Sequence, residues 1–222
     1  MMNILAINGS PRRHWNSELI LEHALQGAQS GGEAQGEIAQ LYPMRYSGCL
    51  GCYACKRKPN QATICQFKDP LTPLLQKAQQ ADVLLLSTPV YFFRESAGMC
   101  AFIERLLYPW TGFFKEGYAS KRPKPLTVGL FYTMAGTEQT VPEHGHEHFA
   151  DSTDVFFSFH FPGYERLMAY ETLHTEDYNA VELDVFDPVA RRKSREERFI
   201  KDCTQARAIG ASLAAKARAA QG

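Results

Sequence analysis

The sequence predicts an α/β fold, with a mostly parallel sheet of five strands and helices on both faces. Short apolar segments alternate along the chain with amphipathic segments of helical period, which is the pattern of such a fold. The segment from 82 to 88 is continuously apolar in its centre, as a strand buried on both faces should be. The first apolar segment runs directly into a Gly-Ser-Pro turn before a helical stretch, which favours a strand-to-helix connection.

The first three elements follow from local pattern. Ile4–Asn8 is a short apolar run and predicts the first strand. Ser17–Ala28 predicts a helix, because its leucine, isoleucine and alanine residues recur at helical spacing. The Ser30-Gly-Gly32 break ends that helix, and Glu37–Tyr42 predicts the second strand.

A loop that carries cysteines, Ser47–Phe67, separates this unit from the next. Pro70–Gln80 predicts a helix, with leucines at helical spacing. Asp82–Thr88 is the third strand, and Ser96–Leu107 predicts the helix that follows it.

The last third of the chain is less regular. Leu126–Thr133 predicts a fourth strand and Arg166–Thr172 a fifth. The region 137–164 has no clear period and is interpreted as an excursion with one helix. Residues 176–192 are first acidic and then basic, which favours a loop, and Arg195–Ala220 predicts a long terminal helix.

These elements predict the flavodoxin-like strand order 2-1-3-4-5. With 222 residues, 45% of them hydrophobic, the chain can form one full-sized core. We therefore expect a single domain over residues 1–222, with a long excursion at about 137–192. Ligands of such sheets bind outside the carboxyl ends of the first and third strands.

Composition excludes several classes of protein. A formal net charge of zero argues against a general nucleic-acid binder, which needs a basic surface. No apolar run approaches the roughly 20 residues that span a bilayer, so no membrane partner is expected. No secretory signal is apparent, and we expect a cytoplasmic protein. In that compartment the six cysteines are expected to be ligands, redox groups or core residues rather than disulfides.

The turn after the first strand has the chemistry of a phosphate site. It ends at a helix N-terminus, where backbone N–H groups and the helix dipole attract anions. An ordinary helix cap is the alternative, because serine and asparagine are common at helix starts. The side chains expected around the phosphate are Ser10, Arg12, Asn16 and Ser17.

The loop after the third strand, Thr88-Pro-Val-Tyr-Phe92, should lie beside that turn. It could present backbone groups to a planar heterocycle, and Tyr91 or Phe92 could cover the ring. The alternative is an ordinary strand–helix connection with aromatic side chains in the core.

Four cysteines follow the pattern Cys49-x2-Cys52-x2-Cys55-x9-Cys65. Thiolates this close could ligate a [4Fe–4S] cluster or hold zinc tetrahedrally, and a loop without metal is the third possibility. The neighbouring basic residues at 56–58 would make exposed thiols more reactive.

Taken in order, these motifs resemble the NADPH-dependent FMN reductase family, which includes flavodoxin-like quinone reductases and iron–sulfur flavoproteins. The resemblance also rests on Phe102-Ile-Glu-Arg105 and covers roughly residues 1–135. It implies non-covalent FMN, with the phosphate in the first turn. It implies that the isoalloxazine is flanked by Pro89, Val90, Tyr91 and Phe92, with a third loop at Thr133, Met134, Ala135 and Gly136. Related proteins often have more glycines in that third loop.

The resemblance implies an NAD(P)H oxidoreductase that reduces a quinone, free flavin or similar small acceptor by ping-pong hydride transfer. No side-chain acid or base is needed, so no catalytic residue is assigned. The alternative is an iron–sulfur flavoprotein that relays electrons between protein partners. The gap before Cys65 is longer than in the iron–sulfur members, so cluster, zinc and metal-free loop all stay open.

Two further motifs have more than one interpretation. His144-Gly-His-Glu-His148 lacks the H-E-x-x-H spacing of a zinc site, which favours a solvated loop. Tyr108-Pro-Trp-Thr-Gly-Phe-Phe114 is either core or a subunit contact. Flavin sites in this family are often completed by a neighbouring chain, so we expect a homodimer or homotetramer.

Overall fold

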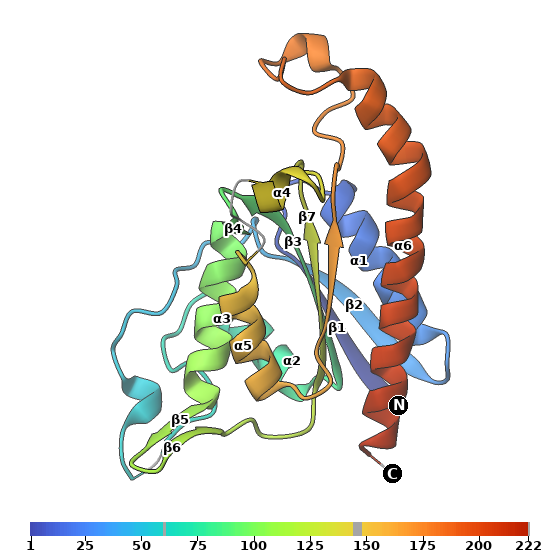
Figure 1. Ribbon diagram of the computed structural model, residues 1–222. Helices are drawn as coiled ribbons and strands as arrows, with labels where there is room; N and C mark the ends of the chain where they lie inside the picture. The colour runs from blue at the N-terminus through green and yellow to red at the C-terminus, as the bar shows by residue number, and fades with distance from the viewer. Residues whose placement is uncertain (60, 144–147, 222) are drawn as a thin grey trace.

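The computed structural model describes residues 1–59, 61–143 and 148–221, and its centre is a parallel sheet with helices on both faces (Figure 1). The strands lie in the order β2-β1-β3-β7-β8, and each neighbouring pair is parallel. Counted along the chain, this is the order 2-1-3-4-5, so the predicted flavodoxin-like topology is confirmed. The five strands are β1 (Met2–Asn8), β2 (Ala34–Gln40), β3 (Val83–Tyr91), β7 (Thr127–Thr133) and β8 (Glu165–Ala169).

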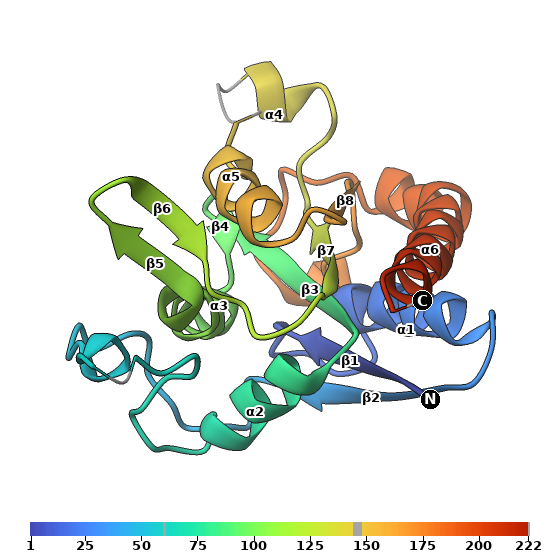
Figure 2. The same ribbon diagram turned by 90° about the horizontal axis from the view of Figure 1, so that it is seen from below.

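Two layers of helices cover the sheet (Figure 2). Successive β1 residues face opposite layers: Leu5 and Ile7 belong to one hydrophobic cluster, and Ile4 and Ala6 to the other. The first cluster packs under α2 (Thr72–Gln80), α3 (Ala97–Trp110) and α5 (Asp151–His160). The second packs under α1 (Asn16–Gln29) and α6 (Pro188–Ala219).

Two glycines allow α1 and α6 to approach closely. A Cβ atom on Gly210 would lie 1.9 Å from the Ala24 carbonyl oxygen, and one on Gly27 would lie 1.9 Å from that of Arg207. Neither contact is possible for a larger residue, so these glycines set the distance between the two helices.

The start of α6 corrects the sequence prediction. Residues 176–192 were expected to be a loop and the helix was expected from Arg195, but α6 begins at Pro188. Asp187 caps it by accepting a hydrogen bond from the Val189 N–H at 2.9 Å, and proline is favourable in the first turn. The Asp-Pro pair was therefore a helix-start signal within the charged run.

Several short elements were not predicted. The region expected to hold one helix contains α4 (Thr140–Glu143) and α5. A hairpin of β5 (Thr111–Phe114) and β6 (Gly117–Ser120) follows α3, and β4 (Arg94–Glu95) turns back on the end of β3. Two short 3₁₀ helices of the described chain are η1 (Ala54–Lys56) and η2 (Tyr178–Ala180).

The carboxyl ends of the parallel strands meet at one edge of the sheet, and the segment between β8 and α6 extends beyond that edge (Figure 1). Among the described helices, none has the length and apolarity to cross a bilayer. The interpretation of one domain over 1–222 stays a prediction. Of the histidine motif, residues 144–147 lie outside the described residues.

Candidate functional site

A pocket of about 230 Å³ lies at the carboxyl edge of the sheet. It brings together three loops that the sequence analysis proposed separately: the first turn, the end of β3 and the end of β7. The predicted residues that line it are Ser10, Arg12, Asn16, Ser17, Pro89, Val90, Tyr91, Thr133, Met134 and Ala135.

Two predicted residues lie outside the lining. Phe92 is 98% exposed at the tip of the β3–β4 turn. Gly136 is behind the wall, where its carbonyl accepts a hydrogen bond from the Glu171 N–H at 3.0 Å.

The pocket also has a wall that sequence reasoning missed. Thr172, Leu173 and His174 line it, and so does Trp15. The first three follow β8, and the predicted order 2-1-3-4-5 already places that loop at the same edge. Topology was therefore the available signal, because the residues themselves form no motif.

The first turn is shaped by its own polar groups. The Ser10 N–H donates to the Asn8 carboxamide at 2.9 Å, and the Arg12 N–H donates to the Ser10 hydroxyl at 3.1 Å. Gly9 is required for packing, because a Cβ atom there would lie 2.8 Å from the Met99 methyl group. The Gly9 N–H donates to the Ser87 carbonyl and the Ser96 hydroxyl donates to the Gly9 carbonyl, which holds the turn against β3 and α3, while Arg12 stays exposed.

Asn16 and Ser17 begin α1 and are buried. The Asn16 amide donates to the Leu173 carbonyl at 2.8 Å, and its oxygen accepts from Arg195 at 2.8 Å. The Ser17 hydroxyl lies 2.8 Å from that of Thr133, which ties the first loop to the third. Asn16 is therefore engaged mainly within the protein.

The charge of the pocket is positive. None of its described lining residues is acidic, and the start of α1 points the positive end of a 14-residue helix at it. Arg12 donates to the His174 carbonyl and stacks on Trp15, with 5.8 Å between guanidinium and ring centre. Such a pocket attracts an anion.

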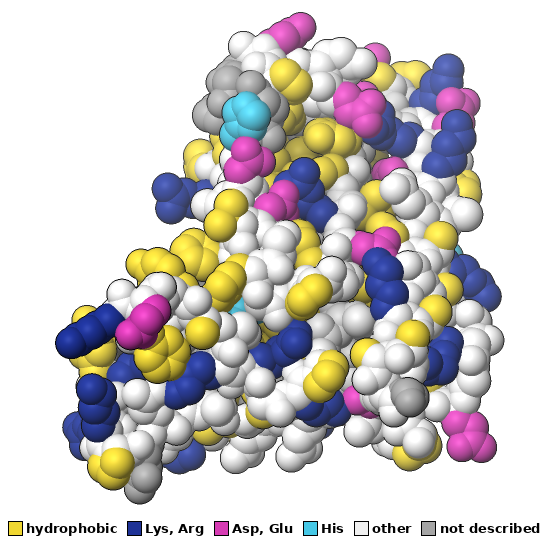
Figure 3. Space-filling model, turned by 60° about the horizontal axis from the view of Figure 1, so that its bottom comes forward, with side chains coloured by type: hydrophobic (Ala, Val, Ile, Leu, Met, Phe, Trp, Pro, Cys, Tyr) yellow, Lys and Arg dark blue, Asp and Glu magenta, His cyan; other side chains and the backbone are white. Residues whose placement is uncertain are grey.

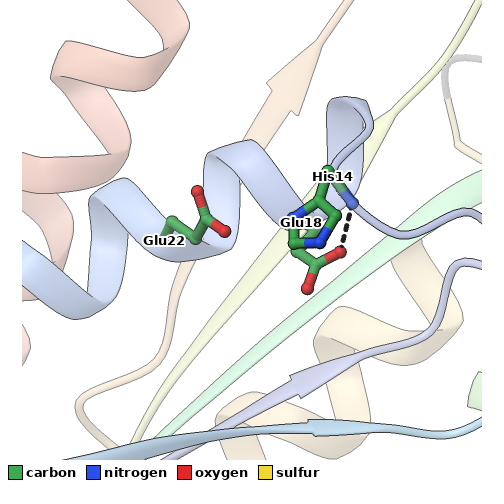
Figure 4. Close-up of side chains that lie close together, drawn as sticks. All are labelled: His14, Glu18 and Glu22. Carbon is green, nitrogen blue, oxygen red and sulfur yellow. Dashed lines mark hydrogen bonds between the residues drawn. The ribbon is translucent and has the colours of Figure 1, made fainter.

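Glu18 stabilises the same turn from the helix side (Figure 4). Its carboxylate accepts from the His14 N–H and, at 2.6 Å, from the Gln40 amide. His14, Glu18 and Glu22 bring three potential metal-ligand atoms within 4.8 Å of one another. Because both Glu18 oxygens have partners, we interpret the group as a helix-capping arrangement.

The end of β3 forms a strained aromatic turn. Val90 pairs with Glu95 and Tyr91 with Arg94, and the two residues between them have positive φ: 50° for Phe92 and 56° for Phe93. Positive φ is unfavourable for bulky residues, and such strain is often kept at functional sites. Burial raises the pKa of Tyr91, which is 45% exposed at the pocket.

Glu95 joins this turn to two other elements. Its carboxylate accepts from the Tyr132 hydroxyl at 2.6 Å and the Thr153 hydroxyl at 2.8 Å. Burial, followed by the Glu95 charge, raises the pKa of Tyr132, so that phenol stays a donor. The aromatic turn is thus anchored to β7 and α5.

The four predicted metal-ligand cysteines, Cys49, Cys52, Cys55 and Cys65, line a second, smaller pocket beside α3. Their donor chemistry fits an iron–sulfur cluster. The pocket is only about 20 Å³, space for about one water molecule, so the loop would have to open to hold a cluster. A zinc site needs its ligand atoms close together. Among the described residues, only His14, Glu18 and Glu22 bring three ligand atoms within 4.8 Å of one another, so the four sulfurs are not gathered in this way.

The cysteine loop is fastened along α3 by buried charge. The Arg105 side chain is fully buried and donates to both carboxylate oxygens of Asp69 and to the Phe67 and Ser47 carbonyls. Lys56 donates to the Tyr108 and Thr111 carbonyls at the C-terminal end of α3. Burial raises the pKa of Cys55, which disfavours its thiolate in this conformation.

Known proteins match the chain in both sequence and fold. The iron–sulfur flavoprotein of Methanocaldococcus jannaschii is 31% identical over 104 residues, covering 47% of this chain and 51% of that protein. The chain spans about half the length of the curated relatives it matches.

Among solved structures, an NAD(P)H:quinone oxidoreductase from Methanothermobacter marburgensis aligns with a TM-score of 0.65 at 16% identity, covering 96% of this chain and 98% of that one. An azoreductase from Bacillus anthracis strain Sterne aligns with a TM-score of 0.66 at 14% identity, covering 95% and 99%. These two likenesses show the fold. Because the model of the NADPH-dependent FMN reductase family matches residues 2–142, the chain belongs to that family of oxidoreductases.

Proposed function

We propose that this protein is an FMN-dependent NAD(P)H oxidoreductase whose cofactor occupies the pocket at the carboxyl edge of the sheet. The observation that carries the proposal is the acid-free pocket, where Arg12 and the start of α1 meet the aromatic end of β3. A phosphate monoester at one end and a planar ring at the other match those two kinds of surface.

The residues divide into two groups. The hydroxyls of Ser10 and Ser17, the Arg12 guanidinium and the first N–H groups of α1 would hold the phosphate. Pro89 to Tyr91 and residues 133–135 would flank the isoalloxazine, and Asn16 would keep the turn in place. We expect one side of the ring site to be open to substrates, since Tyr91 at this end of the pocket is 45% exposed.

When bound, FMN supplies the redox chemistry, which is hydride acceptance from NAD(P)H and two-electron reduction of an acceptor. The chain itself would orient both substrates at the same open face, so the nicotinamide must leave before the acceptor enters. That sharing favours a ping-pong order. The acceptor class is a quinone, free flavin or similar small molecule.

The visible spectrum tests this proposal. Purified protein, as isolated or after addition of FMN, should show flavin absorption bands that bleach on anaerobic addition of NADPH or NADH. Restoration of the bands by a quinone would support the acceptor class. A colourless protein that takes up no added FMN would contradict the proposal.

A second candidate function is electron relay between protein partners through FMN and a [4Fe–4S] cluster. It is favoured by the four cysteines around one pocket and by the iron–sulfur flavoproteins among the relatives. Anaerobic purification followed by iron and acid-labile sulfide analysis distinguishes the two candidates. About four irons per chain would support the relay, and no iron would leave the reductase.

We also propose that the protein acts as a cytoplasmic homodimer or homotetramer and that α5 and the β5–β6 hairpin contact a second copy. Hydrophobic side chains gather on one side of the view in Figure 3, and the structure has an apolar groove of about 690 Å³ between α3, the hairpin and α5. Phe156 is 55% exposed and Tyr118 72% exposed at its rim. Contiguous apolar surface of this kind is typical of protein contacts.

The aromatic patch at 108–114, for which the sequence left core and subunit contact open, has both buried and exposed members. Trp110 is core, packed edge-to-face on Phe161, whereas Phe113 and Phe114 are exposed. Sedimentation analysis should find a dimer or tetramer, and Phe156→Ser should shift it toward smaller species. Ile200→Ser, on the outer side of α6, is the control; a monomeric wild type would contradict the assembly.

A further inference from the structure

The segment between β8 and α6, residues 170–187, lies against the first turn of the chain although it follows that turn by more than 150 residues. We call it the strap. It extends beyond the carboxyl ends of the strands and leads into α6 (Figure 1). The strap lies outside residues 2–142, so the family match does not account for its role.

Three side chains of the first turn are bound to strap carbonyls. The Leu173 carbonyl accepts from the Trp15 indole at 3.2 Å and from the Asn16 amide at 2.8 Å. The next carbonyl, of His174, accepts from Arg12. The shape of the turn therefore depends on where the strap lies.

Arg195, in the first turns of α6, fixes the other end of the Asn16 amide. It donates to the Asn16 oxygen at 2.8 Å and lies 4.2 Å from the ring centre of Phe199. Asn16 is only 6% exposed, so the strap and α6 hold it from both sides. A buried amide with both ends bonded has a single orientation.

The strap is tied to the third pocket loop as well. The Thr172 N–H and hydroxyl both donate to the Met134 carbonyl, at 2.9 and 3.0 Å. The Glu171 N–H donates to the Gly136 carbonyl at 3.0 Å. The strap thus bonds both to the first turn and to the loop after β7.

Positive charge is concentrated where strap, α6 and turn meet. Arg12, Arg191 and Arg195 make no ion pair with a described carboxylate. One Nη atom of Arg191 is buried without a hydrogen-bond partner among the described residues. Burial and the charges of Arg191 and Arg12 lower the pKa of His174, which lines the pocket as a neutral group. Arg12 and Arg191 can stabilise a phosphate dianion, whereas Arg195 lies in the field of the Glu176 carboxylate.

We propose that the strap is the phosphate-side part of the cofactor site, and that Arg195 is a positioning residue that holds the first turn, through Asn16, in its phosphate-binding shape. The inference rests on the proposed function, because it takes the phosphate of FMN as the group that the turn binds. The C-terminal part of the chain then controls affinity for the phosphate rather than for the ring.

A comparison of FMN with riboflavin tests the proposal, because riboflavin has the same ring and no phosphate. Quenching of flavin fluorescence on titration with apoprotein measures both affinities. Arg195→Gln should weaken FMN binding by about tenfold, as expected for loss of a charge-assisted hydrogen bond, and leave riboflavin binding within about twofold. Arg195→Lys should recover part of the loss.

Lys193→Gln is the matched control, because it removes one positive charge near Arg195 on α6 from an exposed side chain. It should leave both affinities unchanged. If Arg195→Gln does not fold, Trp15→Phe removes one strap contact with little change in packing and should weaken FMN by a smaller factor.

The outcomes separate this inference from the function on which it rests. Suppose that the wild type binds FMN, and that Arg195→Gln either keeps its FMN affinity or loses affinity for FMN and riboflavin equally. Either result would overturn the role of Arg195 and leave the proposed function standing. A wild type that binds neither flavin would overturn both.

Discussion

The two ends of α3 show how one helix can border two different kinds of surface. At its start, the buried Ser96 hydroxyl donates to the Gly9 carbonyl at 2.6 Å, and the surroundings are hydrogen-bonded turns. At its end, Thr111 bonds to His160, and the surroundings are the aromatic side chains of the hairpin and α5.

The difference explains what each end can bind. Turns held by side-chain hydrogen bonds present helix N–H groups and hydroxyls at the pocket, which suits an anionic small molecule. An end held by rings and a few buried polar groups leaves apolar surface exposed, which suits another protein chain. If the two ends are energetically independent, a change at one end leaves the properties of the other unchanged.

Arg105→Met should destabilise the fold most, by about 3–5 kcal/mol, because it leaves the Asp69 carboxylate without its buried partner. Urea denaturation measures the loss. Adding Asp69→Leu should recover part of it, since the unpaired charge is then gone. FMN affinity of the folded fraction should not change, and a large change would show that the two ends are coupled.

The double variant Ser10→Ala and Arg12→Ala should weaken FMN binding by about 100-fold, or about 3 kcal/mol, through loss of a charged and a neutral hydrogen-bond donor. The same fluorescence titration measures it. The midpoint of urea unfolding without FMN should fall only slightly, because Arg12 is exposed and the loss of the buried Ser10 hydroxyl removes one hydrogen bond within the turn. Unchanged affinity would mean that the phosphate lies elsewhere.

His160 should make stability depend on pH at the hairpin end. Burial, followed by the Arg122 and Lys56 charges, lowers its pKa from 6.5 to about 4, so the folded protein holds it neutral between Thr111 and Ser120. Below pH 6.5 the unfolded chain binds the proton more readily, so stability falls as the pH falls from 6.5 toward 4. At pH 5 the loss should be about 2 kcal/mol relative to pH 7.5.

Urea unfolding at the two pH values measures this effect, with His160→Gln as the comparison. That variant should be less sensitive to pH over the same interval. An equally steep dependence in His160→Gln would assign the effect to other groups.

Thr153→Val should have the smallest effect, about 1 kcal/mol, because it removes one hydrogen bond to Glu95 and keeps the shape of the side chain. Glu95 joins α5 to the aromatic turn, so this is the direct link between the two ends. A change in FMN affinity larger than the change in stability would show that α5 influences the cofactor pocket.

Local pattern was sufficient for the central sheet. The apolar centre of β3 and the Gly-Ser-Pro turn after β1 each specify their structure within a few residues, because burial on both faces and tight turns restrict composition strongly. The hairpin at 111–120 was missed because its aromatic residues also fit a core patch. The turn at Phe92 and Phe93 was also missed, because a turn with positive φ is normally signalled by glycine or asparagine and neither residue stands at these two positions.

Short-range pattern and the handedness of parallel connections were enough to specify the strand order and the first turn, and the cysteine spacing was enough to place four thiols in one loop. Tertiary packing decided that Leu173, His174 and Arg195 bond to the first turn, because the strand order places the loop after β8 at this edge but no rule specifies contacts between residues more than 150 positions apart. It also decided that Asn16 is held by the protein on both sides and that the cysteine pocket is narrow. Those properties come from packing between distant segments, where burial and hydrogen-bond satisfaction choose the partner.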